Sequence, residues 1–263
     1  MESRPPLVSL LMLGYNSVQY IKAAITSVKL QTYPYWELVF VDDGSTDGTW
    51  ELAEKLAESD ARIKVYRNPR NLGIVHNRQK ALEYSVGDFI GHVDNDDILE
   101  RRALEEMIRA FQEHPKEMLI YSDYGQINAE GDITGYVATK QYKVDDAATH
   151  GWRHFTVYRR RVHQHFGGYN LKLISACEDG DLMARVGEKF GALRLPRVLY
   201  YHRSHGKNAG LTNKKCETCE ERPVCNFIRV WGKAVKYDHI TYQPLTKEQL
   251  HGTDSIPSPT GPT

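Results

Sequence analysis

Residues 7–43 read LVSLLMLGYNSVQYIKAAITSVKLQTYPYWELVFVDD and decide the fold class. They open with LVSLLML and close with WELVFVDD, two largely apolar runs that are typical of strands buried on both faces. Between the runs, the apolar residues recur at helical spacing, as Val18, Ile21, Ile25 and Val28. Asn16 or Ser17 is the predicted N-cap of this helix. The stretch therefore predicts a strand, a helix and a second strand.

The same alternation continues along the first half of the chain. Further helices are predicted at 47–59, 73–86 and 99–114, and further strands at 62–68, 88–94 and 117–123. This pattern predicts an α/β fold of the Rossmann-like kind, with a mostly parallel central sheet and helices on both faces. Residues 124–175 are irregular and aromatic, and they precede a predicted helix at 178–191 and a strand at 194–203.

Composition limits the class of partner. The chain has 263 residues, and Lys plus Arg equals Asp plus Glu at 34 each, so its net charge favours neither nucleic acid nor an anionic membrane surface. It contains no run of roughly 20 apolar residues and no secretion signal at its start. We expect a cytoplasmic protein whose membrane association, if any, is peripheral. Composition does not predict an oligomeric state.

Polar residues follow three of the predicted strands at the point where each strand ends. GYN at 14–16 follows the first strand, Asp42 and Asp43 end the second, and GHVDNDDIL at 91–99 ends the fourth. Because ligands on parallel sheets gather at the carboxyl ends of the strands, we expect these groups to share one site. The close carboxylates of GHVDNDDIL need a positive partner, and a divalent metal carrying a nucleotide diphosphate is the predicted one.

Each acidic group also has a structural interpretation. Asp43, Ser45 or Asp47 fits the cap of the following helix, and Asp97 fits the cap of the helix near Leu99. Two adjacent carboxylates at 42–43 exceed what a cap requires, however, and a carboxylate there can accept the N–H of a pyrimidine base or a ribose hydroxyl.

Three motifs in order carry a resemblance to a known family. VSLLMLGYNSVQYIKAAITSVKLQTYPYWELVFVDDGSTDGT, then NLG at 71–73, then DFIGHVDNDDIL at 88–99 together resemble the inverting family-2 glycosyltransferases of the GT-A fold. The similarity runs from about residue 7 to 125 and more loosely to about 206. It implies a nucleotide-sugar donor, usually linked to UDP, a Mn²⁺ or Mg²⁺ ion, and a hydroxyl acceptor on a glycan or glycoconjugate.

The resemblance also assigns roles at the donor site. Tyr15 would stack on the base, and Asp43, helped by Asp42, would bond the polar edge of that base. The other residues implied near the nucleotide are Arg78, Asp94, Asn95 and Arg203. The implied metal ligands are Asp96, as the principal one, together with Asp94 and His205.

CEDGDLMARV at 177–186 resembles the Glu-Asp segment of the family at a helix start. Asp179 matches the catalytic base that takes the proton of the acceptor, and Glu178 is the adjacent alternative. Alternatively, Glu178, Asp179 and Asp181 only complement the helix dipole. Further along, His202 and His205 would contact the diphosphate or the metal, or belong to a surface loop. Trp152 and His154 are predicted on the acceptor side.

The chain divides into four predicted segments. Residues 1–123 form the nucleotide-sugar-binding half of a GT-A domain, 124–206 its less regular acceptor and lid half with the catalytic base, 207–244 an extension, and 245–263 a tail or linker. The extension contains CETCEERPVC, whose Cys216, Cys219 and Cys225 have the spacing of a structural zinc site. Its fourth ligand would be Cys177 or a histidine. Unbound cysteines or a disulfide remain alternatives.

Two other functions are compatible with such a sheet. A sugar nucleotidyltransferase would carry a glycine-rich phosphate loop after the first strand, and LGYNSVQYI has none. A non-catalytic sugar-nucleotide-binding or scaffold domain is the other alternative. Asp96 and Asp179 argue against it, because a scaffold needs neither a metal ligand nor a base.

Overall fold

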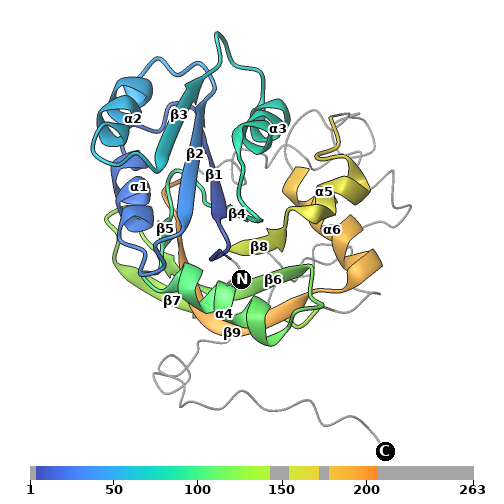
Figure 1. The fold of residues 1–263 in the computed structure, drawn as a ribbon. Helices are drawn as coiled ribbons and strands as arrows, with labels where there is room; N and C mark the ends of the chain where they lie inside the picture. Colours follow the sequence, from blue (N-terminus) through green and yellow to red (C-terminus); the bar gives the residue numbers. More distant parts are fainter. Residues whose placement is uncertain (1–3, 143–153, 172–177, 207–263) are drawn as a thin grey trace, which may run out of the picture.

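A computed structural model describes residues 4–142, 154–171 and 178–206. Within them, one sheet has the strand order β3-β2-β1-β4-β8-β6-β9-β5, with β7 paired to β6 (Figure 1). The strands are β1 (Val8–Gly14), β2 (Trp36–Asp42), β3 (Ile63–Arg67), β4 (Phe89–His92), β5 (Ile98–Leu99), β6 (Leu119–Ile127), β7 (Ile133–Val137), β8 (Thr156–Arg159) and β9 (Leu193–Arg203). The helices are α1 (Ile21–Lys29), α2 (Thr49–Ala57), α3 (Ile74–Tyr84), α4 (Ala103–Glu113), α5 (Arg161–Phe166) and α6 (Glu178–Phe190).

The first four strands in space are parallel, as predicted. β1 pairs with β2 and β4, and β2 pairs with β3, so β1, β2 and β4 end at the same edge. Beyond β4 the sheet is mixed, because β8 runs antiparallel to both β4 and β6, while β9 is parallel to β6. β7, β8 and α5 arise from the stretch that we expected to be irregular. Their short lengths leave no clear hydrophobic period in the sequence.

Helices cover both faces of the sheet. Buried residues of α1, α2 and α4 pack with Leu10 and Met12 in one apolar cluster. Residues of α3, α5 and α6 pack with Leu11 in the other, with Leu13 partly buried against it. Side chains alternate along a strand, so β1 supplies both clusters from a single apolar run. Fully burying each such side chain contributes about 1.5–3 kcal/mol.

Two predicted helix starts are wrong. α1 begins at Ile21 rather than after Asn16 or Ser17, because the Ser17 carbonyl first accepts the N–H groups of Tyr20 and Ile21 in a turn, each at 3.1 Å. α4 begins at Ala103, and Asp97 does not cap it. The residues that follow Asp97 form β5 instead, which pairs with β9.

Candidate active site

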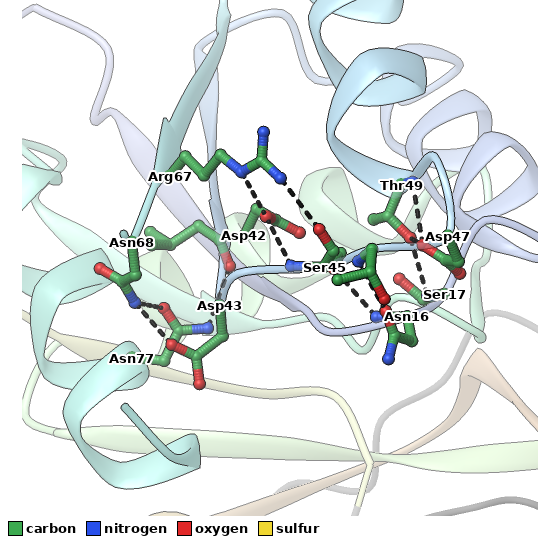
Figure 2. A network of polar contacts seen from close by, with 12 residues as sticks. Asn16, Ser17, Asp42, Asp43, Ser45, Asp47, Thr49, Arg67, Asn68 and Asn77 are labelled. Carbon is green, nitrogen blue, oxygen red and sulfur yellow. Dashed lines mark hydrogen bonds and ion pairs between the residues drawn. The ribbon is translucent and has the colours of Figure 1, made fainter. Parts of the chain in front are cut away.

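The turns that follow β1 and β2 interlock (Figure 2). Asn16 donates its backbone N–H to Ser45 Oγ at 2.9 Å and accepts the N–H of Thr46 on its own Oδ1 at 3.0 Å. Asp47 accepts the N–H of Thr49, the first residue of α2, at 3.0 Å in the turn that precedes the helix. The N-cap is Gly48, which makes no side-chain cap hydrogen bond, so the predicted cap at Asp43, Ser45 or Asp47 is wrong. The two turns are held together, and Tyr15 stands beside them with 52% of its surface exposed.

Asp43 is buried and oriented by three donors from two segments. Its Oδ1 accepts the Asn68 amide at 2.7 Å and the Leu72 N–H at 2.9 Å, and its Oδ2 accepts the Gly73 N–H at 2.9 Å. Asn68 also bonds Asn77 of α3 at 3.0 Å (Figure 2). These contacts fix the Asp43 carboxylate at the N-terminus of α3, and Oδ2 keeps capacity for a further donor.

Asp42, the residue before Asp43, has no exposed surface. Its Oδ2 accepts the Ser45 N–H at 3.0 Å and pairs with Arg67 Nε at 3.3 Å. Its Oδ1 is buried without a hydrogen-bond partner among the described residues. A buried carboxylate oxygen of this kind is costly unless a donor reaches it, which fits a ligand N–H or hydroxyl.

The turn after β4 gathers the acidic cluster. No donor among the described side chains contacts the carboxylate of Asp94, while the Asn95 amide donates to the Leu13 carbonyl and ties the turn to β1. Asp94 is exposed at the surface, yet desolvation by the groups around it and the charge of Asp97 raise its pKa to about 7, against the opposing charge of Arg78. Desolvation and the charge of Asp97 likewise raise the pKa of Asp96. The Oδ2 atom of Asp96 lies 2.9 Å from His205 Nε2. Raised carboxyl pKa values mean that this cluster favours added positive charge.

Asp97 and Arg203 fasten β9 to this turn. Asp97 is fully buried and accepts the Arg203 N–H at 2.7 Å. The Arg203 guanidinium donates to the carbonyls of Asp96 at 2.7 Å, Ala129 at 2.9 Å and Asn128 at 3.2 Å. Arg203 therefore holds main chain beside the candidate metal ligands, and its contact with the diphosphate stays a prediction.

Arg78 and Glu178 form a buried ion pair between α3 and α6. Arg78 Nε lies 2.6 Å from Glu178 Oε1, and their side chains are 5% and 2% exposed. Burial disfavours the charge of Arg78, but Glu178, Asp179 and Asp94 together raise its pKa above the ordinary value. Burial raises the pKa of Glu178, and the Arg78 charge offsets part of that rise.

The three acidic residues at the start of α6 differ in their partners. Glu178 pairs with Arg78, and Asp181 pairs with Arg185 at 2.7 Å. Asp179 has no cationic partner of this kind in the part of the chain that the structure describes, and its Oδ1 accepts only the adjacent Gly180 N–H at 2.7 Å. Of the three carboxylates, Asp179 is the one left available for chemistry.

A buried polar chain that we did not expect lies beside Arg78. His92 Nε2 bonds the Tyr169 hydroxyl at 2.6 Å, which bonds the Tyr158 hydroxyl at 3.0 Å, which bonds His163 Nε2 at 3.1 Å. Burial, Arg78 and His163 lower the pKa of His92 well below its usual range. Burial lowers that of His163 to about 4. The one sequence signal for this series of hydrogen bonds is His92, which lies within the acidic motif GHVDNDD.

The structure brings most of the predicted site residues to one side of the fold. Six of them lie at or just after the ends of β1, β2 and β4: Tyr15, Asp42, Asp43, Asp94, Asn95 and Asp96. The others lie on α3 (Arg78), on α6 (Glu178 and Asp179) and at the end of β9 (Arg203 and His205). The His154 ring stacks on the His202 ring, and the predicted place of His154 on the acceptor side stays a prediction. Trp152, Cys177, Cys216, Cys219 and Cys225 lie outside the described residues, so the zinc prediction and the segments at 207–244 and 245–263 stay predictions.

Comparison with known proteins identifies the class that this fold and site define. Residues 9–167 match the sequence profile of glycosyl transferase family 2, and this chain belongs to that family. The predicted resemblance to the family-2 glycosyltransferases is thereby confirmed.

Individual relatives match this chain over less than half of their own length. The chain is 29% identical over 253 residues to a chondroitin synthase of Pasteurella multocida, a match that covers 94% of this chain and 26% of that protein. It is 37% identical over 108 residues to the putative teichuronic acid biosynthesis glycosyltransferase TuaG of Bacillus subtilis, covering 41% of this chain and 43% of TuaG. The chain thus spans only part of these relatives.

Solved structures share the fold. Residues 1–349 of Staphylococcus aureus TarS in complex with UDP superpose with a TM-score of 0.62 at 23% identity, covering 76% of this chain and 61% of that one. The mannosyltransferase PcManGT of Pyrobaculum calidifontis, in complex with GDP-Man and Mn²⁺, gives a TM-score of 0.63 at 16% identity, covering 88% and 65%. Among the described residues of this chain, no helix has the length and apolarity to cross a membrane.

Proposed function

We propose that the protein is an inverting, metal-dependent glycosyltransferase that moves a sugar from a nucleoside diphosphate donor, with UDP as its nucleotide, to a hydroxyl of a glycan or glycoconjugate. One observation carries the proposal. Asp179 is the carboxylate at the start of α6 without an arginine partner among the described residues, and its charge and that of Asp94 both act on Arg78. The candidate base and one member of the acidic strand-end cluster therefore both act electrostatically on the same guanidinium.

The donor nucleotide would lie on the interlocked turns after β1 and β2. The exposed Tyr15 ring offers a stacking surface for the base. Asp43 Oδ2, and the buried Oδ1 of Asp42 behind it, offer acceptors for the N–H and hydroxyl groups of a nucleoside. The TarS complex with UDP supports this choice of nucleotide.

The residues present fit a divalent ion. Carboxylate oxygens of Asp94 and Asp96 are the ligands that Mn²⁺ and Mg²⁺ prefer, and His205 contacts Asp96 at 2.9 Å. Desolvation, followed by the charge of Asp97, raises the pKa values of both carboxyl groups, and a bound cation would stabilise their charged forms. When bound, such an ion would neutralise the charge that builds on a leaving diphosphate. The complex of PcManGT with Mn²⁺ supports this.

Asp179 would act as the general base. The acceptor hydroxyl oxygen forms a bond to the anomeric carbon on the face opposite the diphosphate, its proton passes to Asp179, and the bond to the diphosphate oxygen breaks. The anomeric configuration inverts because attack and departure use opposite faces. The Arg78–Glu178 pair would act by position, holding the start of α6 against α3.

A thermal-shift titration tests the proposed function. UDP-, GDP- and dTDP-sugars are each added with Mn²⁺ or with EDTA, and a donor that binds only the folded state at a hundredfold excess over Kd stabilises it by about 2.7 kcal/mol. We expect a UDP-sugar to raise the melting temperature only with the metal. Folded protein that responds to none of these donors would contradict the proposal.

A further inference from the structure

A second group of metal-ligating side chains lies beside the acidic turn. Asp97, His154 and His202 come from the turn after β4, the segment before β8 and the end of β9, and their ligand atoms all lie within 4.8 Å of one another. The proposed donor-site ion uses Asp94, Asp96 and His205, so none of these three side chains belongs to that set.

The separation of Asp97 and His202 is informative. His202 Nδ1 lies 3.3 Å from Asp97 Oδ2, which is long for an N–H···O hydrogen bond. Two ligands that are each about 2.1 Å from a zinc ion in tetrahedral geometry are about 3.4 Å apart. The two atoms form a hydrogen bond at this distance, and the same spacing also suits two ligands of one small cation.

The opposite oxygen of Asp97 is already fixed. Asp97 Oδ1 accepts the Arg203 N–H at 2.7 Å, and Asp97 has no exposed surface. The carboxylate consequently presents Oδ2 toward His202 in a set orientation. A ligand that is oriented by a second contact is typical of metal centres.

His154 is placed by an unusual backbone. The next residue, Phe155, is buried and has φ 47°, a left-handed conformation that is rare for a bulky side chain. Such conformations persist where the surrounding structure holds them, and they are frequent at functional sites. Here the bend precedes β8, and the His154 ring stacks on His202 with ring centres 4.3 Å apart and an interplanar angle of 17°. Because imidazole lone pairs lie in the ring plane, one of the two rings has to rotate for both to bind one ion.

We propose that Asp97, His154 and His202 form a binding site for a transition-metal cation of the zinc class. Two imidazoles and one carboxylate are a ligand set that zinc accepts, whereas the oxygen-rich set of Asp94 and Asp96 suits Mn²⁺ or Mg²⁺. The ion would join three segments distant in sequence and brace the turn that carries Asp94 and Asp96. The alternative is a simple ion pair of protonated His202 with Asp97, with His154 stacked on it.

Titration of the full chain with Co²⁺ in place of Zn²⁺ tests this, because absorption in the visible range reports nitrogen and oxygen ligands of Co²⁺. The series compares the unaltered protein with His154→Asn, His202→Asn and His205→Asn, and circular dichroism checks that each variant folds. We expect His205→Asn to keep the visible bands, and the other two to lose them or to weaken Co²⁺ binding at least tenfold.

The design separates this site from the others. Bands that survive in both His154→Asn and His202→Asn would overturn the proposal, whether a cysteine site or the donor site produces them. Bands lost in His205→Asn alone would overturn it too, because they would belong to the Asp96 site. Raising the Zn²⁺ concentration should increase the melting temperature of the unaltered protein but not of His154→Asn, and equal responses would contradict the site even where a variant is less stable.

Discussion

Replacing Arg78 with Met tests the buried ion pair that orders the start of α6. The substitution removes the guanidinium and leaves Glu178, whose side chain is 2% exposed, without its partner. Breaking a buried pair by removing one member costs about 3–5 kcal/mol. We expect the free energy of unfolding at pH 8, measured by urea denaturation, to fall by that amount.

The loss should depend on pH in a defined direction. Burial raises the pKa of Glu178, and removing Arg78 takes away the main charge that opposes the rise, so its folded-state pKa lies above the unfolded value. Such a carboxyl is neutral in both states at low pH and costs stability as pH rises from the unfolded to the folded pKa, by about 1.4 kcal/mol for each unit between them. The destabilisation of Arg78→Met should therefore be smaller at pH 5 than at pH 8.

Two further variants serve as controls. Arg78→Met combined with Glu178→Gln leaves no unpaired charge and should recover more than half of the loss. Arg4→Met removes an exposed partner of Asp88, with side chains 69% and 41% exposed, and should leave stability unchanged within error. A loss below about 1 kcal/mol in Arg78→Met, or one that grows as pH falls, would refute the buried pair.

Three other substitutions test separate parts of the site. Tyr15→Ala should weaken UDP binding in calorimetry by about 1–3 kcal/mol, the range for a base stacked on an aromatic ring, whereas Tyr35→Ala, which removes another exposed tyrosine, should not; equal affinities would contradict the stacking. Gly44→Ala should lower the free energy of unfolding by about 1–3 kcal/mol, because φ is +77° and an added Cβ would lie 2.8 Å from the Arg70 carbonyl carbon. The control Gly180→Ala in α6 should not destabilise the protein, because the added Cβ would meet open space. Asp96→Ala should abolish the effect of Mn²⁺ on UDP-sugar binding, and a metal response that persists would remove Asp96 as a ligand.

Much of the donor half could be predicted from the sequence. LVSLLML and WELVFVDD are long apolar runs, so burial alone identifies β1 and β2, and parallel strands bring Asp43 and Asp94 to one edge. β8, with 4 residues, and α5, with 6, were missed because each spans fewer than three periods of its own pattern, too few for a recognisable repeat. β8 completes the sheet by pairing with β4 and β6, a long-range contact without a local signal.

The roles of individual polar residues were harder to predict for the same reason. Arg78 and Glu178 are 100 residues apart, and only the fold reveals that they pair and so leave Asp179 available. Asp97 resembled a helix cap because it precedes an amphipathic helix, yet its partner is the main chain of β9. Local patterns identified which residue types gather at the site, and tertiary contacts decided what each one bonds.

The most direct test of the account compares Asp179→Asn with the unaltered protein, using whichever sugar nucleotide the thermal-shift titration identifies. Donor affinity and the rate of nucleotide release by transfer are measured on the same preparations. The account predicts unchanged donor affinity and a rate lower by about 10²–10⁴-fold, the usual contribution of a general base. A variant that binds the donor and turns over at nearly the original rate would show that Asp179 is not the base.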